Sequence, residues 1–303
     1  MVATCAMQAR AAEPTEADST DRDYSADLPR LPPTPVNQAL GTFEVEPGFR
    51  LELAAAEPLV TDPVAIDFDE HGRAYVVEML GYSEDAEEML GRIRVLEDSD
   101  RDGQFDTSTV LTDGLAWPTA VLCYDGGVFV GAAPDILYFK DADGDGKAEI
   151  RRVVFTGFGT HNVQGLLNSF RWGLDNRIHV AVSSCGADLR YGEPGRVGPG
   201  APDKPAPLVL RGRNFAFDPK TLEVEATSGA SQHGFSFDPW GNAFTCSNGD
   251  HIQQIVMEDR YLSRNPLMRP PSSLKSIAVE GPAADVFRIS PVEPWREIRT
   301  RLR

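Results

Sequence analysis

The feature that most constrains the fold is an Asp-rich segment that occurs twice, at a constant offset of 43 residues. Residues 96–106 align with residues 139–149, and the same offset relates Val110 to Val153 and Gly114 to Gly157. A fixed period of this size indicates supersecondary units that stack on one another, each too small to bury its own apolar face. The sequence therefore predicts a repeat architecture.

Each copy of the repeated segment carries carboxylates at alternate positions around a turn glycine, Gly103 in the first copy and Gly146 in the second. Hard oxygen ligands at this spacing suit Ca²⁺. The flanks read as strands, and the last loop position holds Thr109 or Arg152 instead of glutamate, so these are not EF-hands. We expect two structural calcium loops; the alternative is two water-solvated turns. The predicted ligands are Asp98, Asp100, Asp102, Gln104 (carbonyl) and Asp106 in the first loop, and Asp141, Asp143, Asp145, Lys147 (carbonyl) and Glu149 in the second.

The charge and the N-terminal residues limit the partners and the location of the protein. A net charge of -17 argues against nucleic-acid binding, which requires a basic surface. No apolar stretch reaches the length of about 18 residues that a transmembrane helix needs. Residues 1–40 read as a signal-like remnant followed by a Pro-rich linker, which favours a periplasmic or extracellular protein. The alternative for residues 1–12 is a disordered cytosolic tail.

Beyond the linker, short apolar runs alternate with turns that contain Asp with Gly or Asn. Four of these pairs read as β-hairpins, at residues 65–77, 121–130, 170–180 and 235–244. Units of about 45–50 residues with four strands are typical of propeller blades. We predict an all-β chain, a β-propeller of the six-bladed type, over residues 41–303. A fifth unit is expected near Asp285–Ile289, so we interpret the chain as a fragment of four to five blades. The alternative is a complete domain of five or fewer blades.

Function is expected where the chain enters each inner strand, because these crossing loops surround the channel of a propeller. His161 and His233 lie in two of the four predicted entry loops. Histidine, with an ordinary pKa of about 6.5, suits proton abstraction at neutral pH. Both are candidate catalytic bases; the alternative is a histidine that only satisfies backbone groups.

Polar side chains that follow these loops are candidates for holding a cofactor. Guanidinium groups bind carboxylates through paired hydrogen bonds, so clustered arginines could hold a tricarboxylated quinone or an acidic sugar. Surface ion pairing is the alternative role for them. The candidate cofactor residues are Gln164, Asn168, Arg171, Arg213, Asn214 and His251. Glu78 and Tyr82 are weaker site candidates.

Several longer strings carry a resemblance to a known family. Residues 132–138, 171–176, 211–215, 258–261 and 286–296 resemble the N-terminal domain of bacterial membrane-bound dehydrogenases of the PVC type. That domain is similar to the soluble quinoprotein glucose and sorbosone dehydrogenases. The resemblance implies a six-bladed propeller that uses pyrroloquinoline quinone and Ca²⁺, with a histidine base in an entry loop, where His161 lies at a similar place. In longer members it also implies a c-type haem module as electron acceptor.

These observations predict an exported quinoprotein-type dehydrogenase that oxidises a small sugar or polyol. The first alternative is a non-catalytic propeller that binds glycans or a partner protein. The second is a calcium-dependent lactonase, in which Glu78, Asn168 and Asn248 could surround a channel-centred Ca²⁺. The sequence contains no Walker loop and no dinucleotide-binding glycine motif, so nucleotide-dependent hydride transfer is unsupported.

Overall fold

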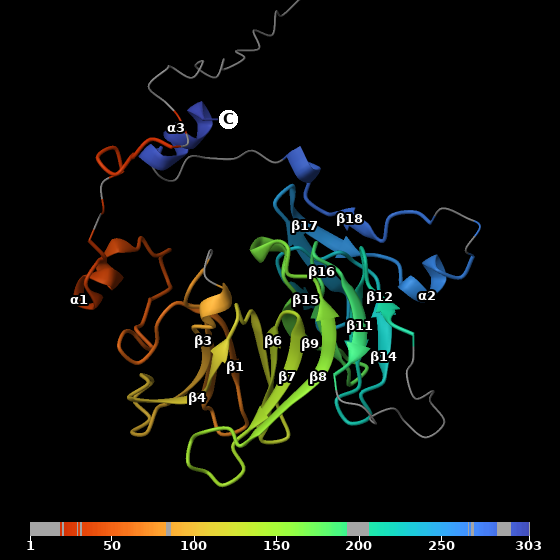
Figure 1. Cartoon of the computed structure of the whole chain (residues 1–303), viewed down its shortest axis with the longest axis horizontal. Coiled ribbons are helices and arrows are strands. Elements are labelled where there is room, and N and C mark those ends of the chain that lie inside the picture. The colour runs from red at the N-terminus through yellow and green to blue at the C-terminus, as the bar shows by residue number, and fades with distance from the viewer. Residues whose placement is uncertain are drawn as a thin grey trace, which may run out of the picture. The chain divides into compact units, whose positions relative to one another are not determined.

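The computed structural model describes residues 19, 21–28, 30, 32–82, 86–192, 206–265, 267, 270–283 and 292–302. The chain divides into two compact units (Figure 1). One unit joins residues 1–44 to residues 285–303, and the other comprises residues 45–284. The described helices of the first unit are α1 (Val36–Ala39), the 3-10 helix η1 (Leu40–Thr42) and α3 (Pro294–Arg301). The predicted site residues all lie in the second unit.

The described residues of the second unit form four antiparallel sheets, three of four strands and one of six, and each sheet contains one four-stranded blade. Blade 1 consists of β1 (Pro63–Phe68), β2 (Ala74–Glu78), β3 (Gly91–Glu97) and β4 (Thr107–Leu115). Blade 2 consists of β5 (Ala120–Tyr124), β6 (Gly127–Ala132), β7 (Asp135–Lys140) and β8 (Ile150–Phe158). Blade 3 consists of β9 (Asn168–Trp172), β10 (Ile178–Ala181), β13 (Asn214–Phe217) and β14 (Val224–Thr227). Blade 4 consists of β15 (Phe235–Phe237), β16 (Ala243–Ser247), β17 (Asp250–Ile255) and β18 (Leu274–Ser276).

The blades are arranged as in a propeller, with the first strand of each blade on the inside. Strand β1 contacts β5, β5 contacts β9, and β9 contacts β15, so the inner strands form one arc (Figure 1). Among the described residues, no strand of blade 4 pairs with blade 1, and the arc is not closed by hydrogen bonds. The prediction of an all-β, propeller-type fold with four-stranded blades is confirmed. No helix in the described part of the chain is long and apolar enough to cross a membrane.

The repeat that predicted this fold has a clear structural meaning. Residues 98–106 connect β3 to β4, and residues 141–149 connect β7 to β8, so the two Asp-rich loops occupy the same place in successive blades. The four predicted hairpins are the β1–β2, β5–β6, β9–β10 and β15–β16 pairs. The expected fifth unit near Asp285–Ile289 and the signal-like residues 1–12 lie outside the described residues.

One feature was not predicted. Between β10 and β13 the chain leaves blade 3 and forms β11 (Ala187–Tyr191) and β12 (Leu208–Val209). Strand β11 pairs with β8 of blade 2, with Arg190 opposite Thr156 and Tyr191 opposite Phe155, so blade 2 becomes part of a six-stranded sheet. The repeat predicts four-stranded units that follow one another along the chain, and an insertion that returns to the previous blade leaves no local signal in the sequence.

Apolar side chains between neighbouring blades form the core. One cluster joins β5–β8 to blade 3 and contains Phe155, Phe170 and Phe217, each at most 1% exposed. A second cluster joins blade 1 to blade 2 and is centred on Ile93 and Phe139, which are fully buried. Burial of this kind is the main stabilising term in folding, so blades 1 to 3 are held together chiefly by these two clusters.

Candidate functional site

The loops that lead into β1, β5, β9 and β15 lie at one end of the blades, because all four inner strands start there. We call this end, with residues 61–63, 116–118, 159–167 and 228–234, the entry-loop face. Two side-chain contacts connect loops of different blades on this face. The indole Nε1 of Trp117 donates to the Gly81 carbonyl at 3.2 Å, and Gln164 Nε2 lies 3.4 Å from Tyr82 Oη. The face is therefore a continuous surface built from several blades.

Glu78 lies beneath the first of these loops, at the end of β2. Its side chain is fully buried, and its carboxylate accepts hydrogen bonds from Thr61 N at 2.6 Å and from Arg94 Nε at 2.9 Å. A third hydrogen bond and ion pair comes from Arg92 Nε. Since the carboxylate is engaged by two arginines and the backbone of the entry loop, Glu78 positions that loop.

Of the two candidate bases, His233 is held by more contacts than His161. Its Nε2 lies 3.1 Å from Asn248 Oδ1, and the backbone N–H of Asn248 donates to Gln232 Oε1 at 3.0 Å. The thiol of Cys246 lies 3.1 Å from the His233 carbonyl oxygen. The side chain is exposed, so a ligand at the surface can reach it. Gln232 was not predicted as a site residue, and its neighbour His233 was the signal that could have pointed to it.

The contact with Asn248 decides which nitrogen of His233 carries the proton. A carbonyl oxygen can only accept a hydrogen bond, so Nε2 of His233 must be the donor. In the neutral imidazole the other nitrogen, Nδ1, then keeps its lone pair. The arrangement presents a basic nitrogen at an exposed position, as a general base for a hydroxyl group requires.

Two residues predicted to bind a cofactor hold the loop that carries this base. Asn168 Oδ1 accepts from Gly234 N at 2.8 Å, and its Nδ2 donates to the Gln232 carbonyl at 3.2 Å. Asn214 is 2% exposed, and its Nδ2 donates to Ser231 Oγ at 2.8 Å. Their polar atoms are engaged by protein groups on both sides of the blade 3–blade 4 junction. Both asparagines therefore act as positioning residues in this structure.

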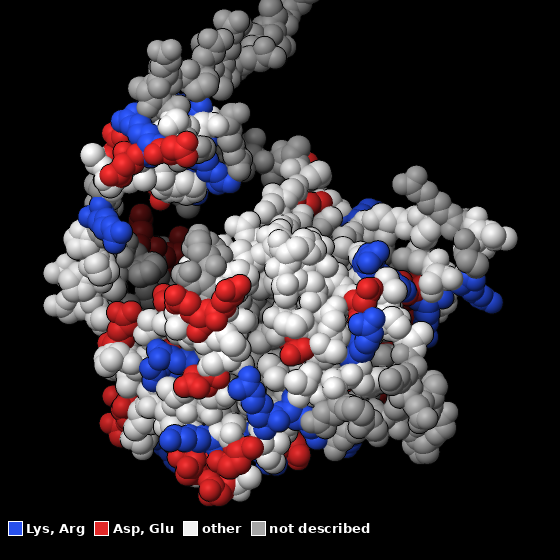
Figure 2. Space-filling view, viewed as in Figure 1, with Lys and Arg blue, Asp and Glu red and all other residues white. Residues whose placement is uncertain are grey.

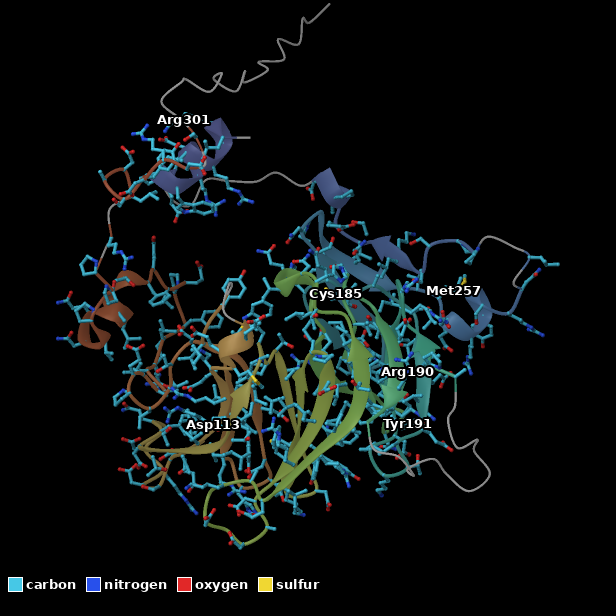
Figure 3. All side chains as sticks on the ribbon, in the orientation of Figure 1. Asp113, Cys185, Arg190, Tyr191, Met257 and Arg301 are labelled. Atoms are coloured by element: carbon cyan, nitrogen blue, oxygen red, sulfur yellow. The ribbon has the colours of Figure 1, made fainter. Side chains whose placement is uncertain are left out.

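His161 and Gln164 lie on the neighbouring entry loop, and both are exposed. Asn162 caps the 3-10 helix η3 (Val163–Gly165) by accepting a hydrogen bond from Gln164 N at 3.0 Å. Cys185, labelled in Figure 3, lies against this loop, with its Sγ 3.3 Å from the Asn162 carbonyl oxygen. The loop is thus anchored at its middle, while the His161 side chain remains accessible.

The structure does not gather the remaining predicted residues around His233. Arg213 lies in the β12–β13 connection, where its Nη1 is 3.1 Å from Asp259 and its Nη2 donates to the Val209 carbonyl. Arg171 lies within β9 and is exposed, with Nη1 donating to the Phe170 carbonyl at 2.9 Å. His251 is exposed on β17. The charge of Arg213 is matched by a carboxylate that the sequence places 46 residues away.

The Asp-rich loops lie at the opposite end of the blades, where the third strand turns into the fourth. In the second loop, one ligand oxygen each from Asp141, Asp143, Asp145 and Glu149 lies within 4.8 Å of the others. In the first loop the same holds for Asp98, Asp100 and Asp106. The predicted ligand Asp102 is not part of that group. Figure 2 shows acidic side chains gathered at the lower edge of the view, over the β7–β8 loop.

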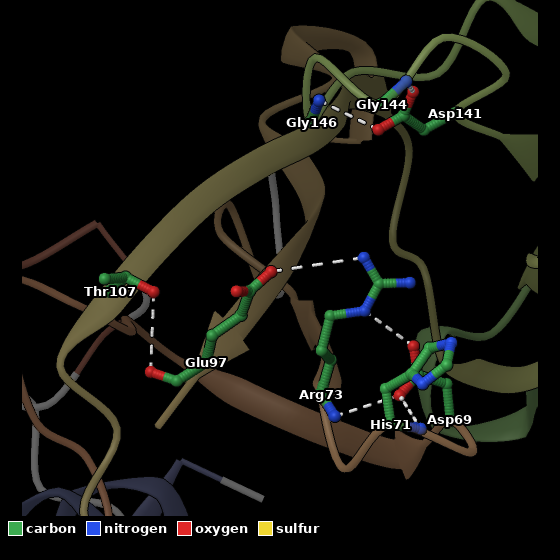
Figure 4. A network of polar contacts seen from close by, with 8 residues as sticks. All are labelled: Asp69, His71, Arg73, Glu97, Thr107, Asp141, Gly144 and Gly146. Atoms are coloured by element: carbon green, nitrogen blue, oxygen red, sulfur yellow. Dashed lines mark hydrogen bonds and ion pairs between the residues drawn. The ribbon is translucent and has the colours of Figure 1, made fainter. Parts of the chain in front are cut away.

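Backbone hydrogen bonds shape the second loop. The carboxylate of Asp141 accepts from Gly144 N at 2.6 Å and from Gly146 N at 2.8 Å (Figure 4). Partial desolvation raises the pKa of Asp141, but these hydrogen bonds outweigh it and lower the pKa below its ordinary value. The carboxylate is therefore ionised at neutral pH, which is the form that a cation requires.

A network next to this loop links the turns of blade 1. Arg73 Nε lies 2.7 Å from Asp69 Oδ2, and its Nη1 lies 4.0 Å from Glu97 Oε1 (Figure 4). Burial raises the pKa of Asp69, but the hydrogen bonds from Arg73 and from the turn backbone lower it overall. Arg73 and Lys140 both line a cavity of about 420 Å³ beside Asp141. This end of the blades therefore combines acidic loops with two nearby cations.

Comparisons with known proteins give the following similarities. The pyranose dehydrogenase PQQ domain from Coprinopsis cinerea is 15% identical, with a TM-score of 0.45 over 70% of this chain and 53% of that chain. A Family AA12 carbohydrate-active enzyme from Trichoderma reesei is 14% identical, with a TM-score of 0.45 over 67% of this chain and 53% of that chain. The chain thus spans about half the length of these structures. No curated protein matches the sequence.

A family model, by contrast, matches nearly the whole chain. The model describes a domain of unknown function, DUF7133, and it aligns with residues 35–302. This range includes all four blades and the entry-loop face. The chain belongs to the DUF7133 family.

Proposed function

We propose that this chain is a sugar- or polyol-directed propeller domain of the quinoprotein type, that His233 takes the proton from a substrate hydroxyl, and that a two-electron acceptor supplied from solution takes the hydride from the carbon that bears this hydroxyl. The observation that supports the proposal is the 3.1 Å contact between His233 Nε2 and Asn248 Oδ1, since a tautomer that donates from Nε2 keeps the lone pair of Nδ1 for a substrate proton. The resemblance of the longer strings to the N-terminal domain of PVC-type dehydrogenases, which is similar to the quinoprotein dehydrogenases, supports the same reaction class.

The charges of the face favour a neutral substrate. Its fixed groups near His233 are amides and hydroxyls, such as those of Gln232, Asn248 and Ser231. Groups of this kind hydrogen-bond to neutral hydroxyls without the desolvation cost of burying a charge. A sugar or polyol has many hydroxyls that can both donate and accept, so it matches this surface.

The quinone that the resemblance implies fits the described residues only in part. Pyrroloquinoline quinone carries three carboxylates, which require cations near them. Arg171 is exposed, but Arg213 is paired with Asp259, and Asn168 and Asn214 are engaged by the protein. The described residues do not by themselves form a site for this cofactor, and we assign no step of the reaction to it.

The His233→Ala variant tests the proposed base. Removing a general base lowers turnover by about 10²–10⁴-fold, so kcat should fall by this factor while KM changes much less. The assay follows dye reduction by the full chain, with added Ca²⁺ and pyrroloquinoline quinone, over a panel of aldoses and polyols. His71→Ala is the matched control, because His71 is exposed in the β1–β2 turn at the other end of the blades.

The outcomes of this assay separate the proposals. A normal kcat in His233→Ala, with the loss found in His161→Ala instead, would transfer the role of base to His161. If no sugar or polyol reduces the dye, the dehydrogenase proposal is wrong. Binding of the same sugars by His233→Ala in that case would support a non-catalytic, glycan-binding propeller.

We further propose that the two Asp-rich loops hold structural Ca²⁺. The close approach of carboxylate oxygens in both loops fits a cation with oxygen ligands, and like charges this close would otherwise repel. The ligands would be the carboxylates of Asp98, Asp100 and Asp106 in the first loop and of Asp141, Asp143, Asp145 and Glu149 in the second, with the carbonyls of Gln104 and Lys147. Asp102 remains a predicted ligand. A calcium concentration high enough to fill weak sites is typical outside the cell, which agrees with the proposed periplasmic or extracellular location.

Calcium should stabilise the protein. When free Ca²⁺ is about a hundred times the Kd, the free energy of unfolding should rise by about 2.7 kcal/mol. The Asp141→Asn, Asp143→Asn double variant should lose the part of this stabilisation that the second loop contributes, whereas Asp113→Asn, an exposed acidic position on β4 labelled in Figure 3, should keep all of it. Because the pKa of Asp141 is lowered, the effect is present at neutral pH and is lost as the pH falls through that lowered value. Urea unfolding with CaCl₂ and with EDTA is the measurement, and equal curves would contradict the proposal.

A further inference from the structure

A cavity of about 650 Å³ lies between blade 3 and blade 4. The β9–β10 and β15–β16 turns line one part of it, and the segment that leads into α2 (Asp259–Leu262) lines another. Met257, labelled in Figure 3 next to this short helix, is one of the lining residues. His233, Gln232 and Asn248 do not line the cavity, although Ser228 at the edge of the entry-loop face and Asn214, which holds the His233 loop, are among its lining residues. Its volume is in the range of small-molecule sites.

The space exists because the apolar core stops at blade 3. Among the described residues, the buried clusters between blades contain no side chain from blade 4. The aromatic side chains of β15, Phe235 and Phe237, instead line the cavity together with His179 of β10. The ring of His179 meets that of Phe237 edge-on, with 5.0 Å between centroids. An aromatic wall is therefore left facing the cavity.

Two exposed apolar side chains lie at the turns. Trp240, in the β15–β16 turn, is 81% exposed, and Leu174, in the β9–β10 turn, is 72% exposed. The two turns approach closely, since a Cβ added to Gly241 would lie 3.2 Å from Leu174 Cδ1. Isolated exposed apolar residues are ordinary on a protein surface. Here a tryptophan and a leucine lie together at the edge of a cavity, where a ring can stack on the indole.

The cavity also contains a buried polar group with no partner. Ser228 is 6% exposed and lines this cavity as well as another of about 470 Å³, and its Oγ has no hydrogen-bond partner among the described residues. Buried hydroxyls are nearly always paired, because an unpaired one loses its hydrogen bonds to water without replacement. The Oγ atom is enclosed by protein atoms, so a ligand in the cavity can pair with it only if the Ser228 side chain turns toward the cavity.

A second polar feature is a His–Asp pair at the same wall. His179 Nε2 lies 3.1 Å from both carboxylate oxygens of Asp175. The position next to it is Gly173, where an added Cβ would collide with the Asp175 carboxylate and the His179 ring. The His179–Asp175 pair therefore fits here because Gly173 has no side chain. Its four-residue spacing across a hairpin turn was not recognised in the sequence analysis.

The charges of the described residues around the cavity offer no partner to an anionic ligand. Four carboxylate residues line it, with Arg260 as the one arginine: Asp175, Glu225, Glu258 and Asp259. Arg260 is paired with Glu258 at 2.5 Å, so it offers little attraction to a further anion. Asp259 and Glu225 are in turn paired with Arg213 and Arg177, so none of the described cations near the wall is left to attract a carboxylate or phosphate. The carboxylate oxygens of the wall can still accept hydrogen bonds from neutral hydroxyls.

We propose that this cavity binds a neutral sugar residue. A pyranose ring has an apolar face that stacks on Trp240, and its hydroxyls can donate to Asp175 and Glu225 and pair with Ser228 Oγ. The site has one platform, several acceptors and no spare cation, and a neutral sugar satisfies all three conditions. This is binding without chemistry, so it does not depend on the oxidation proposed for the entry-loop face.

The test is a calorimetric titration of the full chain with methyl β-glucopyranoside and cellobiose, and with glucuronate as the matched anion. Both neutral sugars should bind, and glucuronate should bind far more weakly. Trp240→Ala should weaken the neutral sugars about 2- to 12-fold, the contribution of an aromatic contact. Trp295→Ala, which removes an exposed tryptophan from α3 in the other unit, is the control and should bind as the unmodified chain does.

Ser228→Ala separates a role in sugar binding from a role in stability, because Tm and sugar affinity are measured on the same variant. Removing an unpaired hydroxyl should leave Tm unchanged or raise it by about 2–4 °C, while sugar affinity falls about 2- to 10-fold. The proposal is overturned if neither neutral sugar binds saturably, if glucuronate binds as tightly as cellobiose, or if Trp240→Ala and Ser228→Ala both bind as the unmodified chain does.

Discussion

Glu78→Ala is expected to lower the free energy of unfolding by about 3–5 kcal/mol, because it leaves two partly buried arginines without their counter-charge. Arg92 and Arg94 have side chains that are 26% and 15% exposed, so water cannot fully replace the carboxylate. The variant also removes the acceptor for Thr61 N in the first entry loop. Chemical denaturation followed by circular dichroism gives the value.

The control for Glu78 is another glutamate in blade 1. Glu97 is half exposed and lies 4.0 Å from Arg73, so Glu97→Ala should cost less than about 1 kcal/mol. A combined replacement of Glu78, Arg92 and Arg94 by apolar residues should recover much of the loss, since no charge is left unpaired. A cost for Glu78→Ala no larger than that for Glu97→Ala would show that the buried charges are not coupled.

Phe155→Ala is expected to cost about 3–5 kcal/mol through the loss of burial and the cavity that remains. Phe155 is fully buried between blades 2 and 3, and its ring lies 5.1 Å from Phe217 and 5.6 Å from Tyr191, measured between centroids. It thus contacts β13 of blade 3 and the inserted strand β11. The same denaturation experiment measures the loss.

Phe68→Ala is the matched control for this substitution. Phe68 lies at the end of β1 and is 53% exposed, so it removes the same side chain from a site with much less burial. Its cost should be well below that of Phe155→Ala, because the stabilisation scales with the apolar area removed from water. Similar losses at the two positions would mean that the contact between blades 2 and 3 contributes little.

The local parts of the fold were predictable from the sequence. Asp and Gly between two apolar runs indicated each hairpin, and the 43-residue offset placed the two Asp-rich loops at equivalent points of successive blades. These signals are local because a turn and its two flanking strands lie within a few residues of each other. The pairing of β11 with β8 joins residues about 30 positions apart, such as Arg190 and Thr156, and no local sequence pattern indicates it.

In the candidate site too, local features were predictable and contacts between distant residues were not. His233 and Asn248 were both placed at the entry-loop end, because antiparallel strands return the chain to the same end after each pair. The sequence does not show whether a side chain already has hydrogen-bond or ion-pair partners within the protein. The ion pair of Arg213 with Asp259 and the hydrogen bonds of Asn214 depend on contacts between separate loops. The unpaired hydroxyl of Ser228 depends on the gap between blades 3 and 4, which only three-dimensional packing reveals.

The strands β11 and β12 have a consequence for the order of folding. During synthesis, blade 2 emerges from the ribosome before the segment that covers its outer edge, because that segment follows β10. Until then the edge of β8 has unpaired N–H and C=O groups that can recruit another chain. Blades 2 and 3 must therefore reach their final form together, and a nascent chain stopped between them would expose a strand edge that the finished molecule conceals.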